Sequence, residues 1–583
     1  MKKRNILKLT SEKEMAILKK ILTNLLVIAV FFAYQHQAAA SEPLPFAEET
    51  KPLMQQKGFL PPIQTDESQL SAVEKIYVRH FKLEGNTVFS DAELFPILEP
   101  YQNRKITPEE LQEAKNKLTR YYYDNGYVNS GAVLPDQKVE NGIIVLRIIE
   151  GKLTRTEVVG EPRLKKRYVS SRLELATSGD KPLNVNFLQD QLKILKQDPR
   201  IENVNASLGP GFGLGEAVLK VGIDEARPYH LSLKFNNYNS PSIGPYRGEV
   251  EFSHLNLTGW GDALTAQYAL TEGLDEYKLN YSIPLTRRDT TLSFSAERSE
   301  ALVVAEPFYS ADMDIRSEIT TYSASLRHPF YKTLAAEFAA GLKFQKRHSE
   351  TRLKDEPFPF PFSGADENGE TDFNVFRFSQ EWVNRSLTSV LAAYSNFSLG
   401  NVDGGEFDGS FFLWLGQFQW INRIDFLNSQ AIFAVNLQLS GDTLVSLQLS
   451  GDTLVSAEKF SIGGSSTVRG YRENQITADN GINASLEWRI PVIQLKIPYL
   501  SKEPGDGMLH LCPFFDFGKG WNTDLEDPED DTIYSAGVGA RWSVGKNLNA
   551  EIYWGKALKT VEDPGEYDIQ DDGIHFQISA ELF

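Results

Sequence analysis

One arginine and one aspartate in the C-terminal part of the chain have residue types suited to an ion pair that holds a loop. Arg469 lies in a segment with three glycines that allow backbone turns closed to other residues, namely Gly463, Gly464 and Gly470. Its guanidinium is planar and permanently charged, so it can grip a carboxylate through two parallel hydrogen bonds. We expect the carboxylate of Asp516, which lies in a strand-like run, to be the acceptor.

Each of these two residues stands in a short motif. The first motif is Val468-Arg469-Gly470-Tyr471 and the second is Phe515-Asp516-Phe517-Gly518. Together the motifs resemble the two signatures of two-partner secretion transporters, the ShlB/FhaC/HecB family of haemolysin and haemagglutinin secretion/activation proteins. Related barrel-assembly insertases carry a motif similar to the first, so the resemblance depends on both motifs together.

The resemblance implies a function and a set of partners. Periplasmic POTRA domains would capture an unfolded exoprotein by its N-terminal secretion domain, and an outer-membrane barrel would conduct it to the cell surface. The implied partners are a large secreted adhesin- or haemolysin-like protein, the lipid bilayer and the outer-membrane assembly machinery. No cofactor is implied. Arg469 and Asp516 would hold a reentrant loop of about residues 457–479 against the barrel wall.

Composition narrows the class of protein independently. The 583 residues are too many for one ordinary domain, and the net charge of −18 argues against binding to nucleic acid. The single cysteine, Cys512, excludes an intramolecular disulfide and a cysteine-based metal site. Mean hydropathy is −0.33, which excludes a helical membrane bundle. It does not exclude a transmembrane barrel, because alternating strands average apolar and polar residues.

The N-terminal part reads as an export signal followed by a linker. Two lysines precede the apolar run 21–33, and Ala38–Ala40 follow it, which is typical of a signal peptide over residues 1–40. A membrane-anchored helix is the alternative. Residues 41–74 are rich in Pro, Gln and Glu and predict a flexible linker. Five prolines argue against a long pore-plugging helix, and a short one around 47–57 stays open.

Two mixed α+β domains follow. Residues 75–153 predict a strand over 76–83, two helices, and two further strands over 131–138 and 142–149, with Thr107 and Pro108 starting the second helix. This β-α-α-β-β order is that of a POTRA domain. Residues 154–228 repeat the order and predict a second POTRA domain. Small sheets of this kind have open edges to which an extended peptide can add by main-chain hydrogen bonds.

Residues 229–583 predict a 16-stranded transmembrane β-barrel, so the fold class is mostly β. We count about sixteen alternating segments, each long enough to cross a bilayer as a tilted strand. Short and long connections alternate, as they do in outer-membrane barrels. In the segment 508–521 the odd positions are mostly apolar and suit lipid, which places Asp516 on the lumen side. The Arg469 loop then starts on the external side and must fold back into a water-filled lumen.

A verbatim duplication precedes this loop. Residues 437–446 recur as residues 447–456. The repeat length is even, so a slip by one copy keeps the lipid and lumen faces unchanged. Either copy could pair in the sheet.

No catalytic or metal-binding signature stands out. The sequence lacks a Gly-x-Ser-x-Gly elbow, a phosphate-binding loop and a His-Glu-x-x-His pattern, and its eight histidines are scattered. We therefore expect no enzymatic activity and no metal. An insertase for other barrel proteins and a passive porin are the alternative functions. The insertase usually has more POTRA domains, and the periplasmic domains argue against the porin.

Overall fold

The computed structural model describes residues 75–177, 181–305, 314–360, 365–403, 409–441, 454, 456–498, 500–501, 503–523, 525–545, 547–561 and 566–582. These form two compact units, one holding most of residues 75–227 and the other most of residues 228–582. The expected signal peptide 1–40, the linker 41–74 and its short plug helix lie outside the described residues. None of the described helices is long and apolar enough to cross a membrane.

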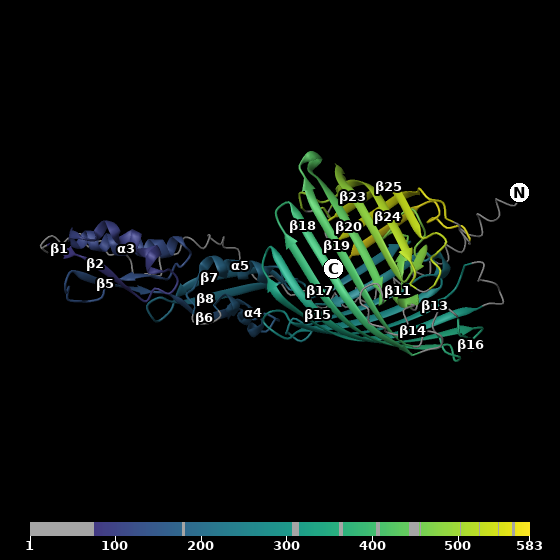
Figure 1. Cartoon of the computed structure of the whole chain (residues 1–583), viewed down its shortest axis with the longest axis horizontal. Helices are drawn as coiled ribbons and strands as arrows, with labels where there is room; N and C mark the ends of the chain where they lie inside the picture. The colour runs from purple at the N-terminus through teal and green to yellow at the C-terminus, as the bar shows by residue number, and fades with distance from the viewer. Residues whose placement is uncertain are drawn as a thin grey trace. The chain divides into compact units, whose positions relative to one another are not determined.

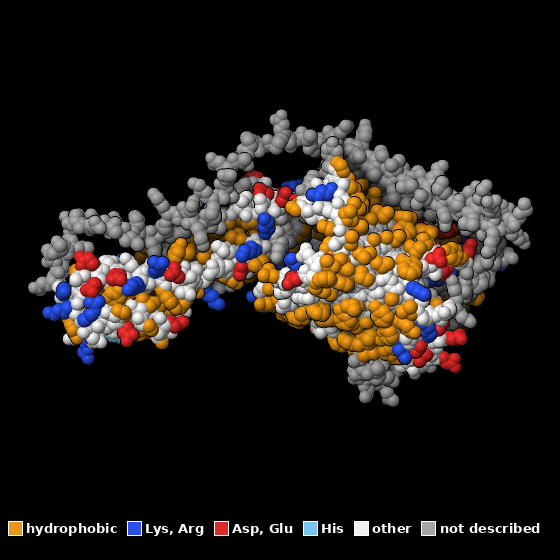
Figure 2. Space-filling view, turned by 90° about the horizontal axis from the view of Figure 1, so that it is seen from above, with side chains coloured by type: hydrophobic (Ala, Val, Ile, Leu, Met, Phe, Trp, Pro, Cys, Tyr) orange, Lys and Arg blue, Asp and Glu red, His pale blue; other side chains and the backbone are white. Residues whose placement is uncertain are grey.

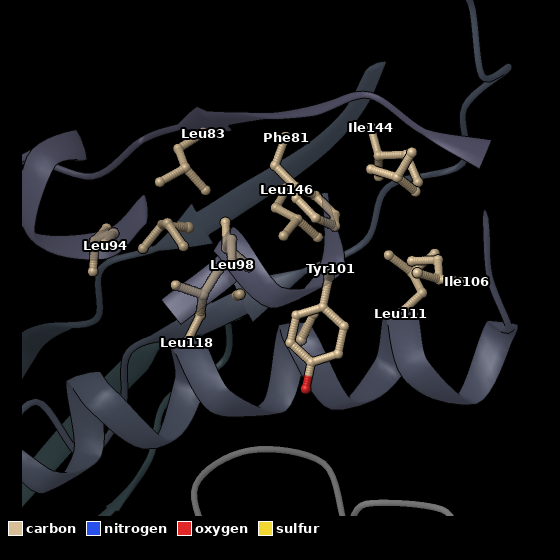
Figure 3. Packing of buried hydrophobic residues seen from close by; sticks show 14 of the residues in the cluster. Phe81, Leu83, Leu94, Leu98, Tyr101, Ile106, Leu111, Leu118, Ile144 and Leu146 are labelled. Atoms are coloured by element: carbon tan, nitrogen blue, oxygen red, sulfur yellow. The ribbon is translucent and has the colours of Figure 1, made fainter. Parts of the chain in front are cut away.

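The first α+β domain has a three-stranded sheet in the order β2-β5-β4, with β2 and β5 parallel. Its elements are β1 Ile76–Val78, β2 His80–Glu84, α2 Asp91–Leu98, η3 Glu99–Tyr101, β3 Arg104–Ile106, α3 Pro108–Asp124, β4 Gly131–Val133 and β5 Ile143–Ile149. Thr107 and Glu110 form a reciprocal capping box that starts α3. Four residues of α3 at helical spacing reach the core: Leu111, Ala114, Leu118 and Tyr122. In this core, leucines, Phe81 and Tyr101 pack between the helices and the sheet (Figure 3).

Two strands of this domain differ from expectation. The predicted strand 76–83 is broken at Arg79, because Ile76–Val78 turns away to pair with β3. The predicted strand 131–138 ends at Val133. The side chain of Gln137 then replaces the ladder, since its amide accepts from the N–H of Val145 at 2.7 Å and donates to its carbonyl at 2.8 Å. A side chain thus covers this edge of the sheet.

The second α+β domain repeats the topology. Its elements are β6 Lys152–Val159, α4 Lys166–Leu173, η4 Glu174–Thr177, α5 Val185–Lys196, β7 Ile201–Pro210 and β8 Glu216–Glu225. The sheet order is β6-β8-β7, with β6 and β8 parallel. Here β7 pairs along most of its ten residues with β8, and no other described strand pairs with its outer edge.

The second unit is a closed barrel of 16 strands (Figure 1), which confirms the predicted architecture. The strands are β9 Tyr229–Asn236, β10 Arg247–His254, β11 Ala263–Leu270, β12 Leu274–Pro284, β13 Thr291–Leu302, β14 Ile315–Lys332, β15 Ala336–Leu353, β17 Glu370–Arg385, β18 Ser389–Asp403, β19 Gly409–Ile424, β20 Ser429–Ser440, β23 Asn480–Gln494, β24 Met508–Trp521, β25 Thr532–Val544, β26 Leu548–Ala557 and β27 Ile574–Glu581. The short β16 Glu356–Pro357 extends β15, and η5 Pro241–Ile243 and η7 Phe426–Asn428 lie in turns.

The two faces of the wall differ in composition. Large apolar side chains point outward and are exposed, and Figure 2 shows them as a broad apolar surface with charged side chains gathered at its margins. From Leu511 onward β24 alternates, since Leu511 and Phe515 are exposed whereas Phe514, Asp516 and Gly518 are buried. Such a wall suits a bilayer outside and a polar interior.

The strands differ greatly in length around the barrel. β14 and β15 have 18 residues each, whereas β9 and β27 have eight. β27 closes the barrel against β9 through five residue pairs, from Asn236↔Gln577 to Ser232↔Glu581. Every other pair of neighbouring wall strands shares at least seven pairs among the described residues. We call the β27–β9 junction the seam.

Candidate functional site

A hairpin that belongs to no wall strand connects β20 to β23. Its elements are η9 Ser456–Glu458, β21 Phe460–Ile462 and β22 Ile476–Ala478, and β21 pairs with β22. Between the two strands lie the three glycines and the first motif. We keep the name reentrant loop for residues 457–479. Its apolar side chains pack with Ile533 of β25 into one buried cluster: Phe460, Ile462, Val468, Tyr471 and Ile476.

Arg469 and Asp516 are joined by three hydrogen bonds. Arg469 Nε donates to Asp516 Oδ2 at 2.8 Å, and Nη2 donates to Oδ1 at 2.9 Å, which is the bidentate geometry. The backbone N–H of Arg469 also donates to Oδ2 at 3.0 Å. Asp516 is fully buried and Arg469 is 6 % exposed. The carboxylate therefore fixes both the side chain and the backbone at the loop tip.

The guanidinium has further partners that the sequence pattern did not lead us to expect. Nη1 donates to Glu487 Oε2 at 2.5 Å, and Nη2 donates to Ser485 Oγ at 3.1 Å. The guanidinium carbon lies 3.7 Å from the ring centroid of Phe514 and 4.7 Å from that of Tyr553. Two carboxylates and two aromatic faces thus surround one cation, which is a stronger binding site than a single ion pair.

The sequence predicts this pair in a wet lumen, and the structure differs. The loop side chains and the wall exclude water from the pair, as the exposures of Arg469 and Asp516 indicate. In a buried setting, removing one partner leaves an uncompensated charge, at a cost of about 3–5 kcal/mol. The pair is therefore far more sensitive to substitution than an exposed one would be.

The remaining residues of the first motif contact the wall at three places. Val468 is fully buried, and a Cβ added to Gly518 of the second motif would lie 2.9 Å from its Cγ2. Gly470 has φ +94, and its N–H faces His575 Nε2 of β27 at 3.4 Å. The Tyr471 hydroxyl lies 2.9 Å from two backbone carbonyl oxygens, those of Tyr534 and Lys559.

The other predicted site residues are placed as follows. Gly463 and Gly464 both have positive φ, and the N–H of Gly463 donates to Thr467 Oγ1 at 2.8 Å to close the turn. Phe515 points outward and is 47 % exposed, so it does not contact the loop. Phe517 has the same parity and is half-buried. Within the second motif, Asp516 and Gly518 therefore face the loop.

The base of the loop has an anchor of its own. Glu458 is 7 % exposed and accepts from Arg377 Nη2 of β17 at 2.7 and 2.9 Å. Arg377 Nη1 donates to Ser398 Oγ at 2.6 Å. Here the loop supplies the carboxylate and the wall supplies the arginine, which reverses the arrangement at the tip. Sequence reasoning missed this pair because nothing local marks Glu458.

Of the duplicated segment, the structure describes residues 437–441, 454 and 456. The first copy starts in β20, where Leu437 and Gln438 pair with Ile482 and Gly481 of β23. Residues 442–453 and 455 lie outside the described residues. Leu454 of the second copy is buried in a cluster with five residues of β17, β18 and β19: Phe373, Val375, Val402, Phe411 and Leu413. Its N–H donates to Asp479 Oδ1 at 3.1 Å.

No metal site is evident in the described parts of the chain, where no three His, Cys, Asp or Glu residues are grouped to hold an ion. Cys512 is buried beside Phe514 and Tyr553 and forms no disulfide. The site is thus a loop tip whose arginine, Arg469, is held by the carboxylates of Asp516 and Glu487 in the wall.

Two family models match this chain. Residues 215–542, more than half of the chain, match the family model of haemolysin secretion/activation proteins ShlB/FhaC/HecB, and residues 76–151 match the ShlB-type POTRA domain. The chain belongs to the ShlB/FhaC/HecB family. It is accordingly an outer-membrane protein of the two-partner secretion type, with a transmembrane barrel and periplasmic POTRA domains.

Individual relatives are distant. The heme/hemopexin transporter protein HuxB of Haemophilus influenzae (strain 86-028NP) is 26% identical over 172 residues, which is 30% of each chain. The outer membrane transporter CdiB of Escherichia coli O6:K15:H31 is 22% identical over 500 residues, 80% of this chain and 76% of the relative. The solved structure of CdiB from Escherichia coli superposes with a TM-score of 0.65 at 18% identity, covering 91% of this chain and 94% of that one, and shows a shared fold.

Proposed function

We propose that this protein binds an unfolded exoprotein through its POTRA domains and translocates it through the barrel to the cell surface. Family membership supports transport as the general activity. The identity of the client is left open by the distance of the relatives, since the HuxB match spans only 30% of that protein's length. A large adhesin- or haemolysin-like protein carrying an N-terminal secretion domain is the partner we propose.

The observation that carries the proposal is the buried Arg469 site inside the barrel wall. A passive channel has no need for a cation enclosed by Asp516, Glu487 and two aromatic rings. A transporter that conducts a chain needs its lumen occupied in one defined arrangement until the client arrives. We propose that the motif residues serve this purpose: Gly463, Gly464, Val468, Arg469, Gly470, Tyr471, Asp516 and Gly518.

The client would dock by adding a strand to a sheet. The second POTRA domain suits this role, because β7 presents a ten-residue edge without a described strand partner. The first domain suits it less, because beyond the end of β4 the Gln137 side chain occupies the main-chain groups of Val145 in β5. We propose the division 75–153, 154–228 and 229–583 as the working domains of the transporter, with export directed by residues 1–40.

The substitution Arg469→Ala tests the proposal in cells that express the protein with its client. It leaves the fully buried Asp516 without its cation and Glu487 with Arg489 alone, so the tip should leave its site while the wall, held by its own ladders, still assembles. Heat-modifiable migration on a gel checks assembly, and immunoblotting of the medium measures export. We expect an assembled barrel with export abolished or crippled.

Arg298→Ala is the matched control, because Arg298 pairs with Glu300 and Glu318 in an exposed position on β13. Its export should stay at the level of the unchanged protein. Near-normal export by Arg469→Ala would contradict the role assigned to the loop tip.

A further inference from the structure

The side chain of Gln570 connects three separate parts of the barrel. Gln570 lies just before β27 and is fully buried. Its Oε1 accepts from the N–H of Glu473 in the reentrant loop at 2.9 Å. Its Nε2 donates to the backbone carbonyls of Asn237 and Asn239, beyond the end of β9, at 2.8 Å each. One amide therefore bridges the loop and both sides of the seam.

The regular strand pairing of the seam is incomplete at its external end. Its regular ladder stops at Asn236↔Gln577, although both backbone segments continue toward the external side. Beyond that point Asn237, also fully buried, acts as a side-chain substitute for a ladder. Its Nδ2 donates to the carbonyl of Ile574 and its Oδ1 accepts from the N–H of Phe576, both at 2.8 Å. The external end of the seam is thus closed by amide side chains.

The loop also touches the strands beside the seam through bare backbone. A Cβ on Gly470 would lie 2.9 Å from the backbone of Gly555 in β26, and a Cβ on Gly573 would lie 3.2 Å from the Cα of Gly470. Three glycines from the loop, β26 and the start of β27 meet here. Because these glycines have no side chains, their backbones are in direct contact. A shift of the loop therefore displaces the backbone that leads into the seam.

We propose that Gln570 is a positioning residue that couples the seat of the reentrant loop to closure of the seam. While the loop is seated, the N–H of Glu473 holds the Gln570 side chain in place to bind Asn237 and Asn239. When the loop leaves, Gln570 loses that partner and the external end of the seam is weakened. The coupling is reciprocal, so an opened seam favours an unseated loop. Joined to the proposed function, the barrel would loosen only while a client displaces the loop.

Hydrogen exchange of the purified full chain tests the coupling without any client. Exchange is read on seam residues 232–237 and 577–581 and on loop residues 460–478, in the unchanged protein, Gln570→Leu, Arg469→Ala and the double variant. Leucine fills a similar space but bonds to none of the three partners. We expect Gln570→Leu to speed seam exchange about tenfold or more.

Two comparisons make the result specific. Arg469→Ala should speed seam exchange when Gln570 is present and add much less when residue 570 is leucine, because only the glycine contacts then connect the loop to the seam. The control Arg472→Leu removes the bonds of the loop to Asp571 and to the Glu566 carbonyl, neither of which belongs to β9. It should loosen the loop and leave residues 232–237 of the seam much less affected than Gln570→Leu does.

Unchanged seam exchange in Gln570→Leu, strictly additive effects in the double variant, or equal seam effects of Gln570→Leu and Arg472→Leu would each overturn the coupling. If Gln570→Leu does not assemble, Gln570→Asn replaces it, because the shorter amide cannot reach the loop and β9 together. Near-normal export by Arg469→Ala in cells, with the exchange pattern as expected, would count against the proposed function and leave the coupling standing.

Discussion

The tip and the base of the reentrant loop are held by the same chemistry with the charges exchanged. At the tip, Arg469 of the loop enters a wall site made by Asp516 and Glu487. At the base, Glu458 of the loop meets Arg377 of the wall. The tip cation has two carboxylates, two aromatic faces and a backbone N–H bond beside it, whereas the base carboxylate has one arginine. The difference indicates that the tip fixes the conformation of the loop and the base fixes only where it starts.

The largest effect is expected from Asp516→Asn. The amide keeps the shape of the carboxylate but turns one of its oxygens into an N–H donor that faces the guanidinium donors. Loss of the charge and of the bidentate hydrogen bonding should reduce the free energy that holds the loop in its site by about 3–5 kcal/mol. Hydrogen exchange of residues 460–478 in the purified barrel measures this. Exchange in Asp516→Asn that matched the unchanged protein would remove the distinction between tip and base.

Gly470→Ala should have the next largest effect. Its φ of +94 is unfavourable for alanine, and the new Cβ would lie 2.9 Å from the backbone of Gly555. The two penalties together should cost about 1–3 kcal/mol, measured by the same exchange. Gly505→Ala is the control, since a Cβ there meets nothing within 4 Å. Equal effects of the two alanines would show that the tip tolerates more space than the structure gives it.

The smallest effect is expected from Glu458→Gln, the counterpart of Asp516→Asn at the base. Glutamine can still accept from Arg377, so only the charge assistance is lost, about 1 kcal/mol. Exchange should rise in residues 456–462 and stay unchanged in residues 466–472. A loop tip released as fully as in Asp516→Asn would mean that base and tip form one cooperative anchor.

Much of this arrangement could be predicted from the chain alone, and the reason is parity. A carboxylate in a strand whose neighbours suit lipid must face inward, and this rule alone assigns Asp516 to the lumen side, where it lies. The same rule applies to Glu487, which lies between the outward-facing Leu486 and Trp488, so its signal was present and was missed. The strand predicted over residues 508–521 is observed over the same residues, Met508–Trp521.

Other parts of the site could not be predicted, for a physical reason. Glu458 and Gln570 lie in irregular segments, where no period says which way a side chain points. Their partners are distant in sequence, since Gln570 binds carbonyls of residues 237 and 239. The short strand β4 was also overestimated, because the Gln137 side chain replaces main-chain pairing and no propensity signals such a substitution.

The unequal strands around the barrel set the form of its external opening. Eighteen residues of β14 span about 60 Å along the strand, and the eight of β27 span about 26 Å. With the usual tilt, the tall side rises well above a hydrocarbon layer of about 30 Å, whereas the low side, at about 20 Å, is shorter than that layer. The external rim of the barrel is therefore slanted and not level. A client exported as proposed would meet the long strands on one side of the opening and the membrane surface on the other.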